Sequence, residues 1–172
     1  LGVPLLIGSA GTAGARPHLD ATLEIVRDIA RAKGLRFRLA SIAADIPKPL
    51  ARDARPLGAM RAMDLERTTH LVGQMGTEAF IRALDAGADV VVAGRACDTA
   101  IFAAIPLMRG YAPGPAMHMA KIIECTSLCC EPGGRDAMLA TLSEDSFELE
   151  SMNPARAATP LSVAAHALYE QE

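Results

Sequence analysis

The spacing of apolar residues along the chain predicts alternating strands and helices. A short apolar run, LLIG, precedes a glycine-rich turn. Apolar residues from Leu19 to Ile29 then recur with helical spacing, and Gly34 ends that helix. Residues 35–42 alternate apolar side chains with arginines, which is typical of a strand with one face in solvent. The first part of the chain therefore reads as strand, helix, strand.

The middle of the chain continues this alternation. Residues 43–63 contain prolines and show little periodicity, so we expect a loop, followed by a short helix over 65–72. Residues 77–84 have a helical pattern that stops at Gly87, and the run ADVVVAG is typical of a strand buried on both faces. Because buried runs that alternate with helices favour a parallel sheet, the pattern predicts an α/β fold.

The pattern of the C-terminal part predicts further helices and two short strands. We expect helices over 99–108, 117–130 and 161–169, with strands at AMLATL and SFELE. The predicted fold is a Rossmann-like layered α/β fold, with a mostly parallel sheet flanked by helices, in a single domain over 1–172. Because the chain starts at Leu1 inside an apolar run, we expect it to be a fragment of a larger domain.

Composition excludes several classes of partner. A chain of 172 residues with 51% apolar content can bury a core, and a net charge of -3 with 3% aromatic residues does not fit nucleic-acid binding. The apolar runs are shorter than the roughly 20 residues needed to span a bilayer, so we expect no membrane association and a cytoplasmic location. Cys125, Cys129 and Cys130 lack the C-x-x-C spacing of structural zinc sites, and we expect no metal.

The turn GSAGTAG has two interpretations. Gly8, Gly11 and Gly14 recur every three residues, and with Ser9 they could hold a phosphate or carboxylate at a helix start. Alternatively, the glycines permit close backbone packing in a tight turn. The spacing is not the G-x-G-x-x-G of dinucleotide-binding folds, which disfavours NAD.

Two charged residues follow the buried strand, where α/β folds bind their ligands. Arg95 offers a planar fork suited to a carboxylate or phosphate, but it could instead form an ion pair with Asp98 or Asp89. Asp98 could act in proton transfer or serve only as a helix N-cap. Cys97 has no adjacent base and is a weak candidate for a nucleophile.

Four side chains of the segment MHMAKIIECTSLCC share one arc of about 120° on a helix. These are His118, Lys121, Glu124 and Cys125. They could form a solvated face with a Lys121–Glu124 pair, or His118 and Glu124 could exchange protons with a ligand. We expect a structural role for His166, while His18 could line the glycine turn.

Several motifs together resemble the acyclic terpene utilisation (AtuA) family. They are LIGSAGTAGA, GTEAFIRALDAGADVVVAGRACDTAIFAAIPLMRG, HMAKIIEC, EPGGRDAMLATL and MNPARAATPLSVAAHALYE. The resemblance implies a role in breaking down citronellol- and geraniol-type terpenes through CoA thioesters. The matched motif positions are Gly94, Arg95, Asp98, Thr99, His118, Lys121, Glu124, Cys125, Asn153, Pro154, Thr159, Pro160 and His166. The chain departs from the family pattern at Cys97, where Ser or Thr is common, and in RAATP, which leaves Arg156 without a neighbouring arginine and cysteine.

The residues and the resemblance together favour an enzyme of acyclic terpenoid or branched-acid catabolism with lyase- or hydratase-type chemistry. The ligand would be a small-molecule carboxylate or an acyl-CoA, and no cofactor is assigned. We expect Gly8, Ser9, Gly11, Gly14, Gly94, Arg95, Thr99 and Lys121 to bind the ligand, and His118, Glu124 or Asp98 to move protons. The alternative is a non-catalytic binding or assembly subunit, as a homo-oligomer or with a partner from the same pathway.

Overall fold

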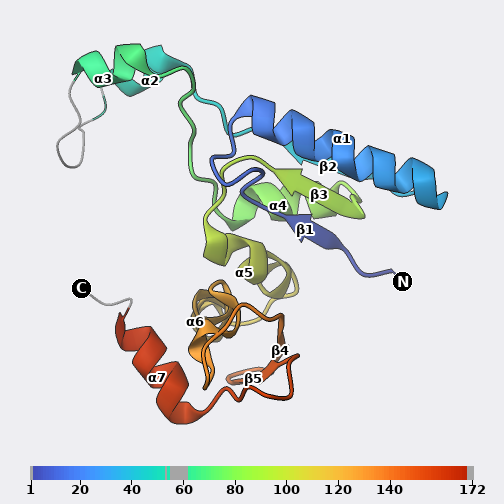
Figure 1. The fold of residues 1–172 in the computed structure, drawn as a ribbon. Helices are drawn as coiled ribbons and strands as arrows, with labels where there is room; N and C mark the ends of the chain where they lie inside the picture. The colour runs from blue at the N-terminus through green and yellow to red at the C-terminus, as the bar shows by residue number, and fades with distance from the viewer. Residues whose placement is uncertain (1, 53, 55–61, 170–172) are drawn as a thin grey trace. The chain divides into compact units, whose positions relative to one another are not determined.

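The computed structural model describes residues 2–52, 54 and 62–169 (Figure 1). The chain divides into two compact units, Leu1–Cys97 and Asp98–Glu172, called unit 1 and unit 2 below. The fold class is mixed α/β, with a parallel three-stranded sheet in unit 1 and an antiparallel two-stranded sheet in unit 2. The single domain expected from the sequence stays a prediction.

Unit 1 is built around a sheet in which all strands run parallel. Its elements are β1 (Leu5–Ile7), α1 (Arg16–Lys33), β2 (Leu39–Ile42), α2 (Lys48–Arg52), α3 (Ala62–Arg67), α4 (Thr77–Asp85) and β3 (Val90–Ala93). The strand order is β1-β3-β2, so β3 is central. Leu5 and Leu39 both pair with Val90, which brings the carboxyl ends of the strands together at one edge.

The core of unit 1 explains why β3 reads as an unbroken apolar run. Val90 and Val92 pack with Leu19 and Leu23 of α1. Because side chains alternate along a strand, Val91 points to the opposite face, and it is fully buried. The prediction of a strand buried on both faces is confirmed.

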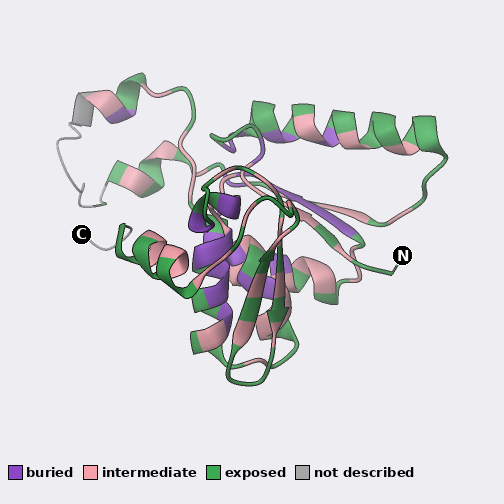
Figure 2. Ribbon diagram, turned by 60° about the horizontal axis from the view of Figure 1, so that its bottom comes forward, coloured by how far each residue is buried: buried purple, intermediate pink, exposed green. Residues whose placement is uncertain are grey.

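Unit 2 combines helices with a hairpin. Its elements are α5 (Asp98–Met108), α6 (Pro113–Ile123), a 3₁₀-helix (Thr126–Cys129), β4 (Met138–Leu142), β5 (Phe147–Ser151) and α7 (Pro160–Tyr169). Buried residues gather in α5 and α6 (Figure 2), and Met119 and Ile123 of α6 pack against side chains of the hairpin. The two strands pair antiparallel, from Met138 opposite Ser151 to Leu142 opposite Phe147, which confirms the two predicted strands.

Three predictions in unit 1 need correction. The strand expected over 35–42 is confined to Leu39–Ile42, because only these residues pair with β3. The expected loop 43–63 contains α2, whose second residue is Pro49, a position where proline is compatible with a helix. The helix expected over 65–72 instead occupies Ala62–Arg67. Residues beyond it leave the helix because they pair with the loop after β2, with Val72 opposite Asp45.

The helix expected over 117–130 is also placed differently. It begins at Pro113, since prolines fit the first turn of a helix, and it ends at Ile123. Thr126 has a φ of 59°, in the left-handed region, which interrupts the helix before the 3₁₀ turn. Cys125 therefore lies just outside α6, between its C-cap Glu124 and the 3₁₀ turn.

Candidate functional site

The glycine turn after β1 packs directly on the loop after β3. Gly14 has a φ of 69°, and a Cβ atom there would lie 2.0 Å from the backbone nitrogen of Arg95. A Cβ atom on Gly94 would lie 2.5 Å from the carbonyl oxygen of Gly14. Backbone therefore meets backbone at this contact, as the close-packing interpretation of the turn expects.

Hydrogen bonds reinforce the same contact. The N–H of Ala10 donates to the carbonyl of Ala93 at 3.1 Å, and the hydroxyl of Ser9 donates to the carbonyl of Ala96 and accepts from its N–H, both at 3.1 Å. The N–H groups of Thr12 and Gly14 bond to carbonyls inside the turn. These N–H groups are engaged within the protein, and anion binding by the turn stays a prediction.

Arg95 lies at the carboxyl end of β3, as the sequence predicts. Its Nη1 donates to the carbonyl of Thr12 at 3.1 Å, which positions the guanidinium over the glycine turn. Among the described residues of unit 1, no carboxylate pairs with Arg95. Asp89, one of the expected partners, instead accepts from the backbone N–H of Arg38 at 2.7 Å. The guanidinium thus keeps N–H donors that could hold an anionic ligand.

A carboxylate–imidazole pair at the same sheet edge was missed by the sequence analysis. Oδ1 of Asp45 accepts from the backbone N–H of Arg16 at the start of α1, at 3.3 Å, and lies 3.3 Å from Nδ1 of His70. Asp45 follows β2 and therefore lies at the carboxyl end of a parallel strand, which is a usable signal in hindsight. His70 lies in an irregular segment with no motif, so nothing in the sequence pattern connected it to Asp45.

In unit 2 the structure brings together three of the predicted site residues. Thr99 of α5 donates its hydroxyl hydrogen bond to Oε2 of Glu124, which caps the C-terminus of α6. Nζ of Lys121 lies 2.6 Å from Oε1 of Glu124. The expected Lys121–Glu124 pair is present, but the Glu124 side chain is only 10% exposed, so the pair is not a simple surface contact.

The other acid–base candidates of unit 2 lie apart from this cluster. His118 is exposed and meets the ring of Phe147 edge-on, with centroids 5.3 Å apart. No contact joins His118 to Glu124 among the described residues. Asp98 is the exposed first residue of α5, and in the described part of unit 2 no backbone N–H donates to its carboxylate. A role of these residues in proton transfer stays a prediction.

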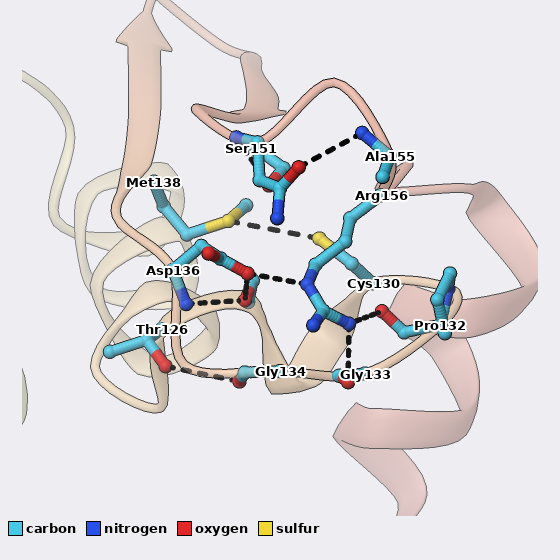
Figure 3. Close-up of polar contacts among 12 residues, drawn as sticks. Thr126, Cys130, Pro132, Gly133, Gly134, Asp136, Met138, Ser151, Ala155 and Arg156 are labelled. Atoms are coloured by element: carbon cyan, nitrogen blue, oxygen red, sulfur yellow. Dashed lines mark hydrogen bonds and ion pairs between the residues drawn. The ribbon is translucent and has the colours of Figure 1, made fainter.

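Arg156 joins two of the sequence motifs (Figure 3). Its Nε pairs with Asp136, and its Nη1 donates to the carbonyls of Pro132 and Gly133 at 2.7 and 2.6 Å. Desolvation alone would raise the pKa of the Asp136 carboxyl. Hydrogen bonds and charge from Arg156, with hydrogen bonds from Asn153 and Ser127, overcome this and hold the pKa below its usual value. Arg156 therefore acts as a structural latch between the EPGGRD and NPAR motifs.

Cys129 is not suited to act as a nucleophile. Cys129 is fully buried, and burial together with the neighbouring Cys130 raises the pKa of its thiol to about 11. Among the described residues, no three His, Cys, Asp or Glu side chains gather into a possible metal site. In the same part of the chain, no helix is long and apolar enough to cross a membrane.

Fold and site together define a mixed α/β protein in which an arginine, a glycine turn and an Asp–His pair lie at the carboxyl edge of a parallel sheet. Residues 6–143 match the model of the acyclic terpene utilisation family protein AtuA. Because this match covers most of the chain, the protein belongs to that family, which is involved in acyclic terpene utilisation. No curated protein and no solved structure matches the chain.

Proposed function

We propose that the protein binds a carboxylated or CoA-linked intermediate of acyclic terpenoid or branched-acid catabolism and acts on it by lyase- or hydratase-type acid–base chemistry. The intermediates would be those of citronellol- or geraniol-type degradation. Arg95 and the glycine turn would hold the anionic part of the ligand. The proposal extends the family assignment from a pathway to a ligand class.

The observation that carries the proposal is the placement of Arg95. Its guanidinium lies at the carboxyl edge of a parallel sheet, where α/β folds bind ligands, and one of its N–H groups is fixed by the carbonyl of Thr12. No carboxylate of unit 1 neutralises it in the described residues. A cation held in place without a counter-ion favours recognition of a carboxylate or phosphate.

Further parts of the proposal rest on the sequence. We place the sheet of unit 1 in a Rossmann-like layered fold, and the protein in the cytoplasm, where thiols stay reduced. His118, Glu124 and Asp98 remain candidates for moving protons, and Gly94, Thr99 and Lys121 for ligand binding. The protein could work as a homo-oligomer or beside a partner subunit of the pathway.

Calorimetric titration of the intact protein tests the proposal. The panel is CoA, geranyl-CoA, a carboxylated terpenoyl-CoA and the corresponding free acids. We expect one thioester or acid to bind selectively and Arg95→Ala to weaken that binding at least about tenfold, since a charge-assisted hydrogen bond contributes roughly 1.5–3 kcal/mol. Arg27→Ala is the matched control, because Arg27 is exposed in the middle of α1 and its loss changes the net charge equally.

The outcomes separate three cases. Binding that disappears in folded Arg95→Ala and persists in Arg27→Ala supports the site. Equal binding in both variants would show that the ligand binds somewhere other than the loop after β3. Binding without turnover of any intermediate would favour the alternative, a non-catalytic binding subunit, whereas no binding to any panel member would refute the proposal.

A further inference from the structure

We infer that His70, oriented by Asp45, is the proton-transfer group of the site at the carboxyl edge of the unit 1 sheet. The inference rests on the proposed function, because it assigns a residue to chemistry on a ligand held by Arg95. Neither residue belongs to a motif that the family resemblance singled out. The pair is recognised only from the geometry of the fold.

Asp45 is held firmly enough to orient a partner. It follows β2, and its backbone pairs with Val72. Two backbone hydrogen bonds of 2.8 Å flank this pairing. The N–H of Ile46 donates to the carbonyl of Leu71, and the N–H of Gly73 donates to the carbonyl of Ala44. Its carboxylate is fixed from a second side by the N–H of Arg16. A carboxylate with both its backbone and an oxygen held in this way is preorganised.

The contact with Asp45 determines which nitrogen of His70 is available. Nδ1 lies 3.3 Å from the carboxylate, and a carboxylate can only accept a hydrogen bond, so Nδ1 carries the hydrogen. In the neutral ring Nε2 then has the lone pair. The His70 side chain is 42% exposed, and among the described residues nothing else bonds to its ring, which leaves Nε2 open to a ligand.

The pair is close to Arg95 in the fold. A Cβ atom on Gly94 would lie 2.8 Å from the Cβ of Ala44, so the loops after β3 and β2 are in contact. Asp45 directly follows Ala44 in the chain, and Arg95 directly follows Gly94. Consecutive Cα atoms are about 3.8 Å apart, which places the Cα atoms of Asp45 and Arg95 within roughly 14 Å of each other. One ligand of acyl-CoA or terpenoid size spans that distance.

The pair suits the addition of water to an α,β-unsaturated acid or thioester. Nε2 takes a proton from water while the water oxygen bonds to the β-carbon and the π electrons move to the α-carbon. The imidazolium then returns the proton to the α-carbon, so one water is added and the ring ends neutral. Elimination is the same sequence in reverse. Asp45 stabilises the imidazolium without taking the proton.

The candidates of unit 2 are less suited to this step. Both oxygens of Glu124 are engaged, one by the hydroxyl of Thr99 and one by the ammonium of Lys121. His118 has an aromatic neighbour, Phe147, rather than an orienting carboxylate. His70 combines an oriented ring with an open nitrogen.

The first test measures the tautomer of His70 in the intact protein by NMR with ¹⁵N-labelled histidine. The signals that disappear in His70→Gln are those of His70, and spectra are recorded at a pH at which the ring is neutral. We expect the Nδ1–H tautomer in the wild type. Asp45→Asn should keep this tautomer, because its amide oxygen still accepts the hydrogen bond from Nδ1, and Asp45→Ala should lose it. An Nε2–H tautomer in the wild type would overturn the inference, since Nε2 could not then act as the base.

The second test measures ethoxyformylation of His70 by mass spectrometry, with and without the panel member that binds. We expect at least tenfold slower modification of His70 in the presence of ligand, with protection lost in Arg95→Ala. Added N-acetylhistidine, which should react equally with and without ligand, is the reagent control. Where turnover is measured, His70→Gln should lower kcat at least about 100-fold, in the range typical of a lost acid–base group. Full reactivity of His70 under saturating ligand, or unchanged kcat, would overturn the inference while leaving ligand binding intact. Absence of binding in the wild type would instead refute the proposed function.

Discussion

Two arginines show how differently the same side chain is used. Arg156 directs its donors to Asp136 and to the carbonyls of Pro132 and Gly133. In the described part of unit 1, by contrast, the side chain of Arg95 bonds to one group, the carbonyl of Thr12. The first arrangement leaves little for a ligand, and the second leaves most of the guanidinium available. Residue type and motif membership could not separate these roles, because both arginines lie in motifs that carry the family resemblance.

Replacement of Arg156 should destabilise unit 2. Arg156→Ala removes the latch, and because water can replace the donor to the exposed carbonyls of Pro132 and Gly133, it should lower the free energy of unfolding by about 0.5–1.5 kcal/mol. Urea unfolding measures the change. Arg135→Ala is the control, since Arg135 is an exposed arginine of the same segment, and equal effects of the two variants would contradict the latch.

Two glycines with nearly the same backbone conformation should respond differently to alanine. Gly34 has a φ of 63°, and nothing lies within 4 Å of an added Cβ. Gly34→Ala should therefore lower the free energy of unfolding only by the left-handed backbone strain, about 1–2 kcal/mol. Gly14→Ala adds a collision with the backbone of Arg95 and should cost more than about 4 kcal/mol or prevent folding. Thermal unfolding and soluble yield compare the two, and similar losses would argue against the close approach of the turn.

At the level of elements, α5 and α6 are joined by a polar contact inside an apolar interface. Thr99 is 7% exposed and donates to Glu124, while Ala103 and Ala120 are fully buried nearby on the same helices. Small side chains let the helices approach, and the hydroxyl–carboxylate bond satisfies a carboxylate that is largely shielded from water. The sequence predicted α5 well but extended α6 too far, because helical periodicity does not reveal the left-handed backbone at Thr126.

Loss of this hydroxyl should weaken the pairing of the two helices. Thr99→Val keeps the shape but leaves Oε2 of Glu124 without its donor, and should lower the unfolding free energy by about 1–3 kcal/mol. Thr99→Ser keeps the hydroxyl and should cost less. A double-mutant cycle with Glu124→Ala, which removes the acceptor, measures the coupling, and additive effects would show that the contact contributes nothing.

At the level of the whole molecule, the pH dependence of stability should report the Asp136–Arg156 contact. The folded-state pKa of Asp136 lies below the unfolded value of 3.8, so its stabilising effect is complete above that value and is lost as the pH falls through the lower folded-state pKa. Asp136→Asn should therefore be less stable than the wild type near pH 6. The two should converge below pH 3.8, and a constant difference in denaturation free energy from pH 6 to pH 3 would contradict this.

The sequence predicted the elements of the sheet better than the site. The unbroken apolar run ADVVVAG identified β3, helical spacing identified α1, and the short segments AMLATL and SFELE identified the hairpin strands. These elements could be predicted because the pattern of buried side chains is a local property of the sequence. The position of Arg95 directly after a buried strand of a predicted parallel sheet allowed it to be placed at a ligand-binding edge. Asp45 and His70 could not be paired, since their contact depends on a loop-to-loop pairing, Asp45 with Val72, that leaves no periodic signal.

The contact between Gly14 and Gly94 also limits how the sequence can change over generations. A side chain at Gly73 would meet the terminal methyl of Ile46 at 2.7 Å, so a shorter residue at position 46 could suppress a Gly73→Ala defect. A side chain at Gly14 would meet the main chain of Gly94 and Arg95, and no replacement there removes main-chain atoms. A genetic selection should thus recover second-site suppressors for the first defect and only true revertants for the second.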